Sequence, residues 1–171
     1  MTLLSKAQAL EHLEQHRRQL LDEGESCLMC ALVRGRVSPA PLDDSEHAAV
    51  VLNRFASRSG HLMVVAKRHV EHATELDWMA YARVQRHVYQ ASRAVQLALR
   101  PVRLFTATLG AAVPLPMSYA HYHVHVIPVH DTDEQARPAK VLSWSSGVVV
   151  YTDQEAEDLR TKILSAWPAG E

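Results

Sequence analysis

The sequence lacks the features that would assign it to a membrane, secreted or nucleic-acid-coating class. It has no apolar run near the roughly 20 residues of a membrane helix, and its N-terminus has no basic segment followed by an apolar one. Neither sign of charge dominates, because 18 Lys and Arg residues stand against 19 Asp and Glu residues. Gripping a nucleic acid polymer through its phosphates needs a basic excess. We therefore expect a cytoplasmic protein without membrane or polymer binding, whose nucleotide ligand, if any, is small.

Cysteine is also scarce, since the only two, Cys27 and Cys30, lie three positions apart in a chain of 171 residues. In a reducing compartment this spacing is poorly explained by a structural disulfide. It is typical of metal ligands or of a redox pair, and two buried cysteines without a metal are a third reading. With 47% hydrophobic and 22% charged residues, a chain of this length can bury a stable core without disulfides or an obligatory metal ion.

The distribution of apolar residues predicts an α+β protein. Helical spacing of leucines indicates an amphipathic N-terminal helix over about 4–22, and a longer pattern indicates a helix over 76–99 that Pro101 ends. Short apolar runs predict strands over 31–35, 47–53, 61–67, 102–109, 119–129 and 146–151. Thr152 and Glu155 form a capping box that opens a last helix. We expect an antiparallel sheet with the long helix packed on it.

Three histidines alternate with apolar residues in the predicted strand over 119–129. His121, His123 and His125 would point to one face of that strand, about 6 to 7 Å apart along it, and the residues between them would enter the core. An edge strand with outward polar residues is the plainer alternative. Strict alternation of three imidazoles on an otherwise apolar strand favours a site that surrounds a small charged group.

The segment HYHVHVI, residues 121–127, resembles the signature of the histidine-triad superfamily of nucleotide hydrolases and transferases. The segment LNRFASRSGHLMVVAKRHV, residues 52–70, is similar to that family's Asn, Gly-His and Lys-x-His pattern. The resemblance covers about 27–131 and is closest to the diadenosine-polyphosphate hydrolase and phosphorylase branch. It implies one domain with this core, the N-terminal helix, and a strand–helix extension over about 132–171.

The resemblance also implies the chemistry. His123 would be the nucleophile that forms a nucleotidyl-histidine at an α-phosphate, and His125 and Ser118 would contact phosphate oxygens. The substrate would be a dinucleoside polyphosphate or a nucleoside phosphoramidate, and the protein a homodimer.

Three more residues would bind the nucleotide in this picture. Asn53 matches the position that hydrogen-bonds the ribose, although an Asn that starts a turn explains it equally well from composition alone. The base would lie near Leu52 and Phe55.

Two positions depart from the family pattern. Met117 stands where many relatives have a Gln, and Thr108 where an Asn is frequent. Loss of one donor near the transferred phosphate costs on the order of a hundredfold in rate where oxyanion-type stabilisation applies. The alternative function is therefore a non-catalytic or very slow module that binds nucleotides or partners through a degenerate triad site.

In part of the same superfamily a CxxC pair joins two histidines around zinc. The matching ligands here would be Cys27, Cys30, His69 and His121. Four protein ligands close a tetrahedral coordination sphere, so the zinc would be structural rather than a Lewis acid in the reaction. It would fasten the N-terminal segment to the strand that carries His123.

Overall fold

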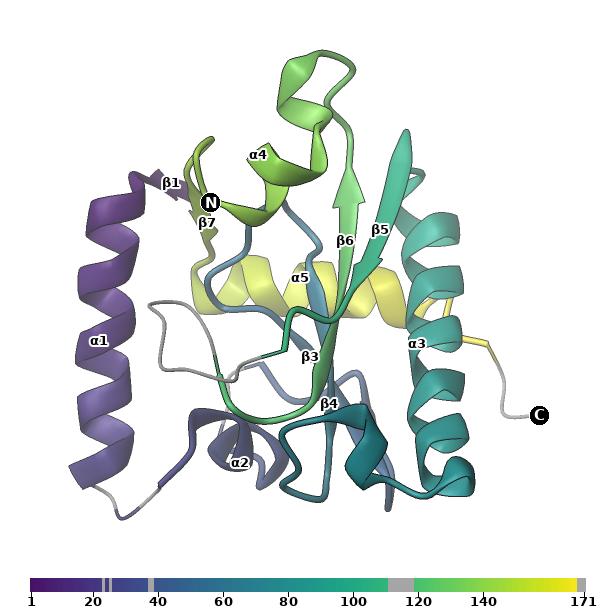
Figure 1. Ribbon diagram of the computed structural model, residues 1–171. Helices are drawn as coiled ribbons and strands as arrows, with labels where there is room; N and C mark the ends of the chain where they lie inside the picture. Colours follow the sequence, from purple (N-terminus) through teal and green to yellow (C-terminus); the bar gives the residue numbers. More distant parts are fainter. Residues whose placement is uncertain (23, 25, 37–38, 111–118, 169–171) are drawn as a thin grey trace.

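In the computed structural model, helices lie around a central sheet (Figure 1). The structure describes residues 1–22, 24, 26–36, 39–110 and 119–168. In chain order the elements are β1 (Thr2–Leu4), α1 (Lys6–Asp22), α2 (Leu28–Val33), β2 (Asp43–Asp44), β3 (Ala48–Leu52), β4 (Leu62–Ala66), the 3-10 turn η1 (Ala73–Glu75), α3 (Trp78–Leu99), β5 (Arg103–Ala107), β6 (His123–Val129), the 3-10 turn η2 (Glu134–Ala136), α4 (Pro138–Leu142), β7 (Val148–Val150) and α5 (Asp153–Leu164). None of the helices in these residues combines the length and apolar character of a membrane span.

The main sheet has five strands in the order β2-β3-β4-β6-β5, and every neighbouring pair is antiparallel. The strands predicted over 47–53 and 61–67 are confirmed as β3 and β4, which pair antiparallel in a register that places Leu52 opposite Leu62. Strand β6 lies between β4 and β5, so His125 pairs with Met63 on one side and with Ala107 on the other. The histidine strand is therefore held by neighbours on both sides.

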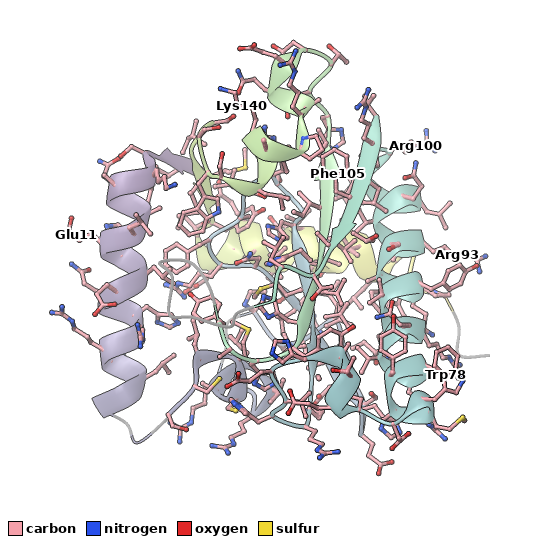
Figure 2. All side chains as sticks on the ribbon, viewed as in Figure 1. Glu11, Trp78, Arg93, Arg100, Phe105 and Lys140 are labelled. Carbon is pink, nitrogen blue, oxygen red and sulfur yellow. The ribbon has the colours of Figure 1, made fainter. Side chains whose placement is uncertain are left out.

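Helices α3 and α5 cover one face of the sheet and form the main core with it. Helix α3 begins after Asp77, whose carboxylate accepts the backbone N–H of Ala80, and it ends two residues before Pro101. The predicted capping box of α5 is present at Thr152 and Glu155. The prediction that the residues between the histidines enter the core is confirmed, because Tyr122, Val124 and Val126 belong to this cluster. Charged side chains such as Glu11 on α1 and Arg93 on α3 point away from the protein (Figure 2).

The opposite face carries three smaller apolar clusters. The first packs α2 on β3 and β4 through Met29 and Met63. The second joins α1 to Phe55 and to Trp144, which precedes β7. The third packs α4 on Ile127 of β6. These clusters surround the part of the sheet that bears the histidines.

Several predicted elements differ from the structure. The strand predicted over 31–35 is wrong, because Leu28–Val33 forms helix α2, in which the N–H of Ala31 bonds the carbonyl of Cys27 at 3.1 Å. The segment between β6 and β7 contains η2 and α4, for which no helix was predicted. Strand β1 was not expected, and it pairs with β7 in a separate two-stranded sheet.

The strand predicted over 119–129 begins only at His123. The backbone N–H of Tyr122 bonds the carbonyl of Val70 at 2.6 Å, a residue that lies beyond β4. Alternation along the strand therefore applies to His123 and His125, whereas His121 precedes the strand and is almost completely buried, at 1% exposure. The expectation that one strand face carries all three imidazoles is corrected accordingly.

Candidate functional site

A cavity of about 130 Å³ lies where the three small clusters meet. Its polar lining includes Asn53, Ser57, His61 and His125. Its apolar lining comes from all sides, and includes Leu13 of α1, Leu28, Met29 and Leu32 of α2, Phe55, Ile127 of β6, Leu142 of α4, and Trp144. A mainly apolar cavity with a few convergent polar groups is the usual form of a small-molecule site.

His123 is oriented by its own backbone neighbourhood. Its Nδ1 lies 2.6 Å from the carbonyl oxygen of His121. A carbonyl only accepts hydrogen bonds, so Nδ1 carries the proton and Nε2 keeps its lone pair. The ring stands edge-on to His125, with 4.8 Å between the ring centroids.

His125 has the opposite tautomer, and the cause lies in the loop between β3 and β4. The backbone N–H of Ser57 donates to His61 Nδ1 at 3.3 Å, so the proton of His61 is on Nε2. That Nε2–H donates to His125 Nδ1 at 2.9 Å. The remaining nitrogen of His125, Nε2, therefore carries a proton. The site presents a lone pair on His123 and an N–H donor on His125.

The pKa values of these rings favour the neutral forms. Burial, with the nearby charge of His123 as a second cause, lowers the pKa of His125 to about 3. Burial first, and then His125 and His123, hold the pKa of His61 well below 6.5. The pKa of His123 is also lowered by burial, against the hydrogen bond to His121, which raises it. Neutral rings are required for the tautomers assigned above.

Asn53 stands at the end of β3, beside His61. Its Oδ1 accepts the N–H of Phe55 at 3.1 Å, which fixes the amide so that Nδ2 lies 3.3 Å from His61 Nδ1. The turn-starting role that composition allowed is thus present, and the side chain also lines the cavity. Both properties are compatible in one residue.

A second cluster of polar side chains lies beside this site. The ligand atoms of Cys27, Cys30, His69 and His121 are within 4.8 Å of one another. His121 Nδ1 is 3.6 Å from each sulfur, and His69 Nδ1 is 3.2 Å from Cys30 Sγ. His121 Nε2 donates to the carbonyl of Ala66 at 2.8 Å, so its lone pair faces the two sulfurs.

These distances fit a metal ion. Zinc bonds of about 2.3 Å to sulfur and about 2.0 Å to nitrogen, in a tetrahedron, place a sulfur and a nitrogen about 3.5 Å apart. The observed separations of 3.2 to 3.6 Å lie close to that edge length. The four residues could therefore hold one metal ion, in a set without an open position.

The structure brings most of the predicted site residues together. Phe55 and Leu52 both line the cavity, and Leu52 also belongs to the main core. Ser118 and Met117 lie outside the described residues, and Thr108 is exposed after β5.

Sequence reasoning did not anticipate the contact of His61 with His125, nor the walls that α1, α4 and Trp144 contribute. The apolar Leu28 and Met29 inside the CxxC segment were a usable signal for the α2 wall. No local pattern marks Trp144.

Comparison with known proteins is consistent with this geometry. An uncharacterized HIT-like protein of Mycoplasma genitalium is 25% identical over 107 residues, which are 63% of this chain and 75% of that protein. The structure of a Hit-like protein from Bartonella henselae, a protein described as involved in cell-cycle regulation, has a TM-score of 0.67 at 16% identity. The match covers 82% of this chain and 96% of that protein's chain. A zinc-bound histidine triad family protein from Mycobacterium smegmatis has a TM-score of 0.60 at 19% identity, over 82% of this chain and 94% of its own.

The HIT domain itself matches residues 41–132, which is more than half of the chain. This range contains β2 to β6 and thus His61, His123 and His125 of the candidate site. The chain belongs to the HIT domain family.

Proposed function

We propose that this protein cleaves or transfers a nucleotide at its α-phosphate through a covalent nucleotidyl intermediate on His123. Membership of the HIT family supports nucleotide binding or hydrolysis in general. The proposed substrates are a dinucleoside polyphosphate or a nucleoside phosphoramidate, and the acceptor is water or another nucleophile. The assignment to the diadenosine-polyphosphate branch stays a prediction.

The observation that carries this proposal is the pair of opposite tautomers on neighbouring rings. His123 keeps a lone pair on Nε2 because its Nδ1–H bonds the carbonyl of His121. His125 keeps a proton on Nε2 because its Nδ1 accepts from His61. A nucleophile beside a neutral donor is the arrangement that attack on an anionic phosphoester requires.

The chemistry proceeds in two displacements. The Nε2 lone pair of His123 forms a bond to the α-phosphorus, while the bond from phosphorus to the bridging atom breaks and that atom leaves with the electron pair. A bridging oxygen leaves as a phosphate anion, and a bridging nitrogen takes up a proton from solvent and leaves as an amine. The hydrogen bond from Nδ1–H to His121 stabilises the positive ring of the intermediate, and the Nε2–H of His125 donates to a non-bridging phosphate oxygen. Water then adds to phosphorus, the bond to His123 breaks, and the proton of water passes to solvent.

The other predicted residues have roles around this step. Asn53 would bind the ribose hydroxyls, and the base would lie in the apolar part of the cavity near Leu52, Phe55 and α2. Ser118 stays the predicted phosphate ligand from the segment before β6. The apolar walls exclude water from the phosphate, which strengthens each hydrogen bond made to it.

The test is to trap the intermediate. Incubation with a dinucleoside polyphosphate, acid-free quenching and intact-mass analysis should show one nucleotidyl adduct on the wild-type chain and none on the His123→Ala variant. The variant should still bind a nucleoside monophosphate, as measured by calorimetry. Binding without adduct or product in the wild type would contradict the proposal and favour the alternative, a binding module without turnover.

We also propose that the ion held by Cys27, Cys30, His69 and His121 is zinc with a structural role. Two thiolates and two imidazoles are a ligand set that zinc prefers, and the fold neighbour from Mycobacterium smegmatis is described as zinc-bound. The ion would link α2 to the residue just before β6. Thiolate ligands are best kept in a reducing compartment, in line with the predicted cytoplasmic location.

We further infer a homodimer. Strand β5 ends the main sheet, and apolar side chains are exposed on α3 and just before β5, with Tyr89 at 64%, Leu97 at 56% and Val102 at 60% exposure. Light scattering after size exclusion should give twice the chain mass. Leu97→Glu should shift the mass toward the monomer, whereas Leu3→Glu, at a similarly exposed leucine on β1, should not.

A further inference from the structure

Arg58 connects the catalytic loop between β3 and β4 to the segment after β6. Its side chain is 13% exposed and donates three hydrogen bonds in different directions. Nε donates to Asp131 at 2.6 Å, Nη1 to the carbonyl of Ser57 at 2.7 Å, and Nη2 to the carbonyl of Gln135 at 2.9 Å. Each nitrogen of the guanidinium group thus has an acceptor of its own.

The same residue also holds the backbone of His61. The carbonyl of Arg58 accepts the N–H of His61 at 3.1 Å, which closes a turn over residues 58–61. Gly60 has a φ of +85°, a conformation that other residues rarely adopt, and its N–H donates to the hydroxyl of Tyr151 at 2.9 Å. The loop is therefore fixed on both sides, by Arg58 and by a tyrosine from the C-terminal segment.

We propose that Arg58 is a positioning residue for the His61–His125 pair. Its side chain holds the carbonyl of Ser57 and its own carbonyl holds the N–H of His61, so Arg58 fixes the backbone between these two residues. The Ser57 N–H, whose peptide plane is held by the bond from Val149 N–H to the Ala56 carbonyl, then points at His61 Nδ1. This N–H, together with the Nδ2–H of Asn53 at 3.3 Å from the same nitrogen, decides the tautomer of His61, and through it the tautomer of His125. The inference rests on the proposed function for its catalytic consequence, but its structural part concerns only protons on two rings.

The choice of arginine follows from the geometry. Three acceptors that belong to two separate segments converge on one planar group, and a guanidinium presents its donors in such a fixed fork. Lysine keeps the charge, but its single ammonium group does not reproduce the fork. Asp131 accepts the hydrogen bond of Nε, while Ser57 in the loop accepts that of Nη1. Arg58→Lys and Asp131→Asn therefore test the same hydrogen-bonded pair, one variant at each partner.

The first measurement is the tautomer of His125 itself. Long-range proton–nitrogen NMR spectra of the full chain labelled with ¹⁵N-histidine distinguish a protonated ring nitrogen from an unprotonated one. The wild type should show His125 protonated at Nε2. Arg58→Lys and Asp131→Asn should each show a population with the proton on Nδ1. Arg160→Lys is the matched control, because Arg160 also bonds backbone carbonyls, those of Ala40 and Pro41, far along the chain from the histidines.

The second measurement is turnover of a dinucleoside polyphosphate. Loss of positioning should lower kcat by about tenfold or more in both variants, as misplacement of a catalytic group does, with a smaller change in KM. The Arg160→Lys control should keep the wild-type kcat. If Arg58→Lys fails to fold, Asp131→Asn, which keeps the side-chain volume, decides the question.

An unchanged His125 tautomer in a folded Asp131→Asn variant would overturn the proposal. An inactive wild type with the expected tautomer shift would instead reject the proposed function and leave the positioning role supported.

Discussion

Acid should destabilise this protein through the buried His61–His125 pair. Both rings have pKa values lowered chiefly by burial, that of His125 from 6.5 to about 3. In the unfolded chain the same imidazoles bind protons below pH 6.5. Between these limits the unfolded state binds more protons than the folded state, so the free energy of unfolding falls as the pH falls. The stabilising effect is complete above pH 6.5 and is lost progressively toward pH 3.

The magnitude follows from the shift of His125. One pKa unit corresponds to about 1.4 kcal/mol, so lowering the pH from 8 to 5 should cost about 2 kcal/mol through this ring alone. His61 adds a loss of the same sign. Against a typical total of about 5–15 kcal/mol, a change of this size is measurable.

Urea unfolding followed by fluorescence at pH 8, 7, 6 and 5 measures it. The wild type should lose at least about 2 kcal/mol more between pH 8 and pH 5 than the His125→Gln variant does. His12→Gln, which removes an exposed imidazole from α1, is the control and should follow the wild type. Because His125 contributes to the lowered pKa of His61, the difference reports the pair rather than one ring. Parallel curves for wild type and His125→Gln would refute the reasoning.

Three further predictions test other parts of the molecule. Metal analysis should find about one zinc per chain. Cys30→Ser should lower both the zinc content and the melting temperature, because binding of zinc to a closed site contributes to folding. An unchanged melting temperature would contradict the structural role. Binding of a nucleoside monophosphate should change the fluorescence of Trp144, which lines the cavity. Trp144→Phe should remove most of this fluorescence change, whereas Trp78→Phe, at a residue that is 74% exposed on α3, should retain it. The reverse result would place the ligand elsewhere. Ile163→Ala should lower the free energy of unfolding by about 2–5 kcal/mol, because this side chain is fully buried between α5 and the sheet, and urea titration measures the loss.

The sequence predicted the parts of the fold that depend on local periodicity. Strands β3 and β4 and helix α3 have the expected type and nearly the expected bounds, because the strands are short continuous apolar runs and the apolar residues of α3 repeat at helical spacing. The segment over 31–35 was misjudged because its three apolar residues, 31–33, fit either a strand or a buried helix turn. Packing of Met29 and Leu32 on the sheet decides for the helix.

The site was predictable in its residue types and less so in its contacts. The motif around His123 and the CxxC pair identified both clusters, which the structure brings together. The position of His121 was misjudged because strand alternation was applied to residues that precede the first residue of β6. Where the strand begins depends on the hydrogen bond from Tyr122 to Val70, a contact distant in sequence that no local pattern encodes.

The three imidazoles of the motif show how one side chain takes three roles. The rings are chemically identical, and each receives a different acceptor or donor from the backbone or from a neighbouring ring. His123 is a nucleophile because its Nδ1–H bonds a carbonyl, and the lone pair of His121 faces the sulfurs because its Nε2–H bonds a carbonyl. His125 is a donor because its Nδ1 accepts the N–H of His61, which leaves the proton on its own Nε2. The motif therefore supplies only the rings. The roles come from β4, from the β3–β4 loop and from the turn before β6, so a change in those segments that leaves every histidine in place should still alter the chemistry.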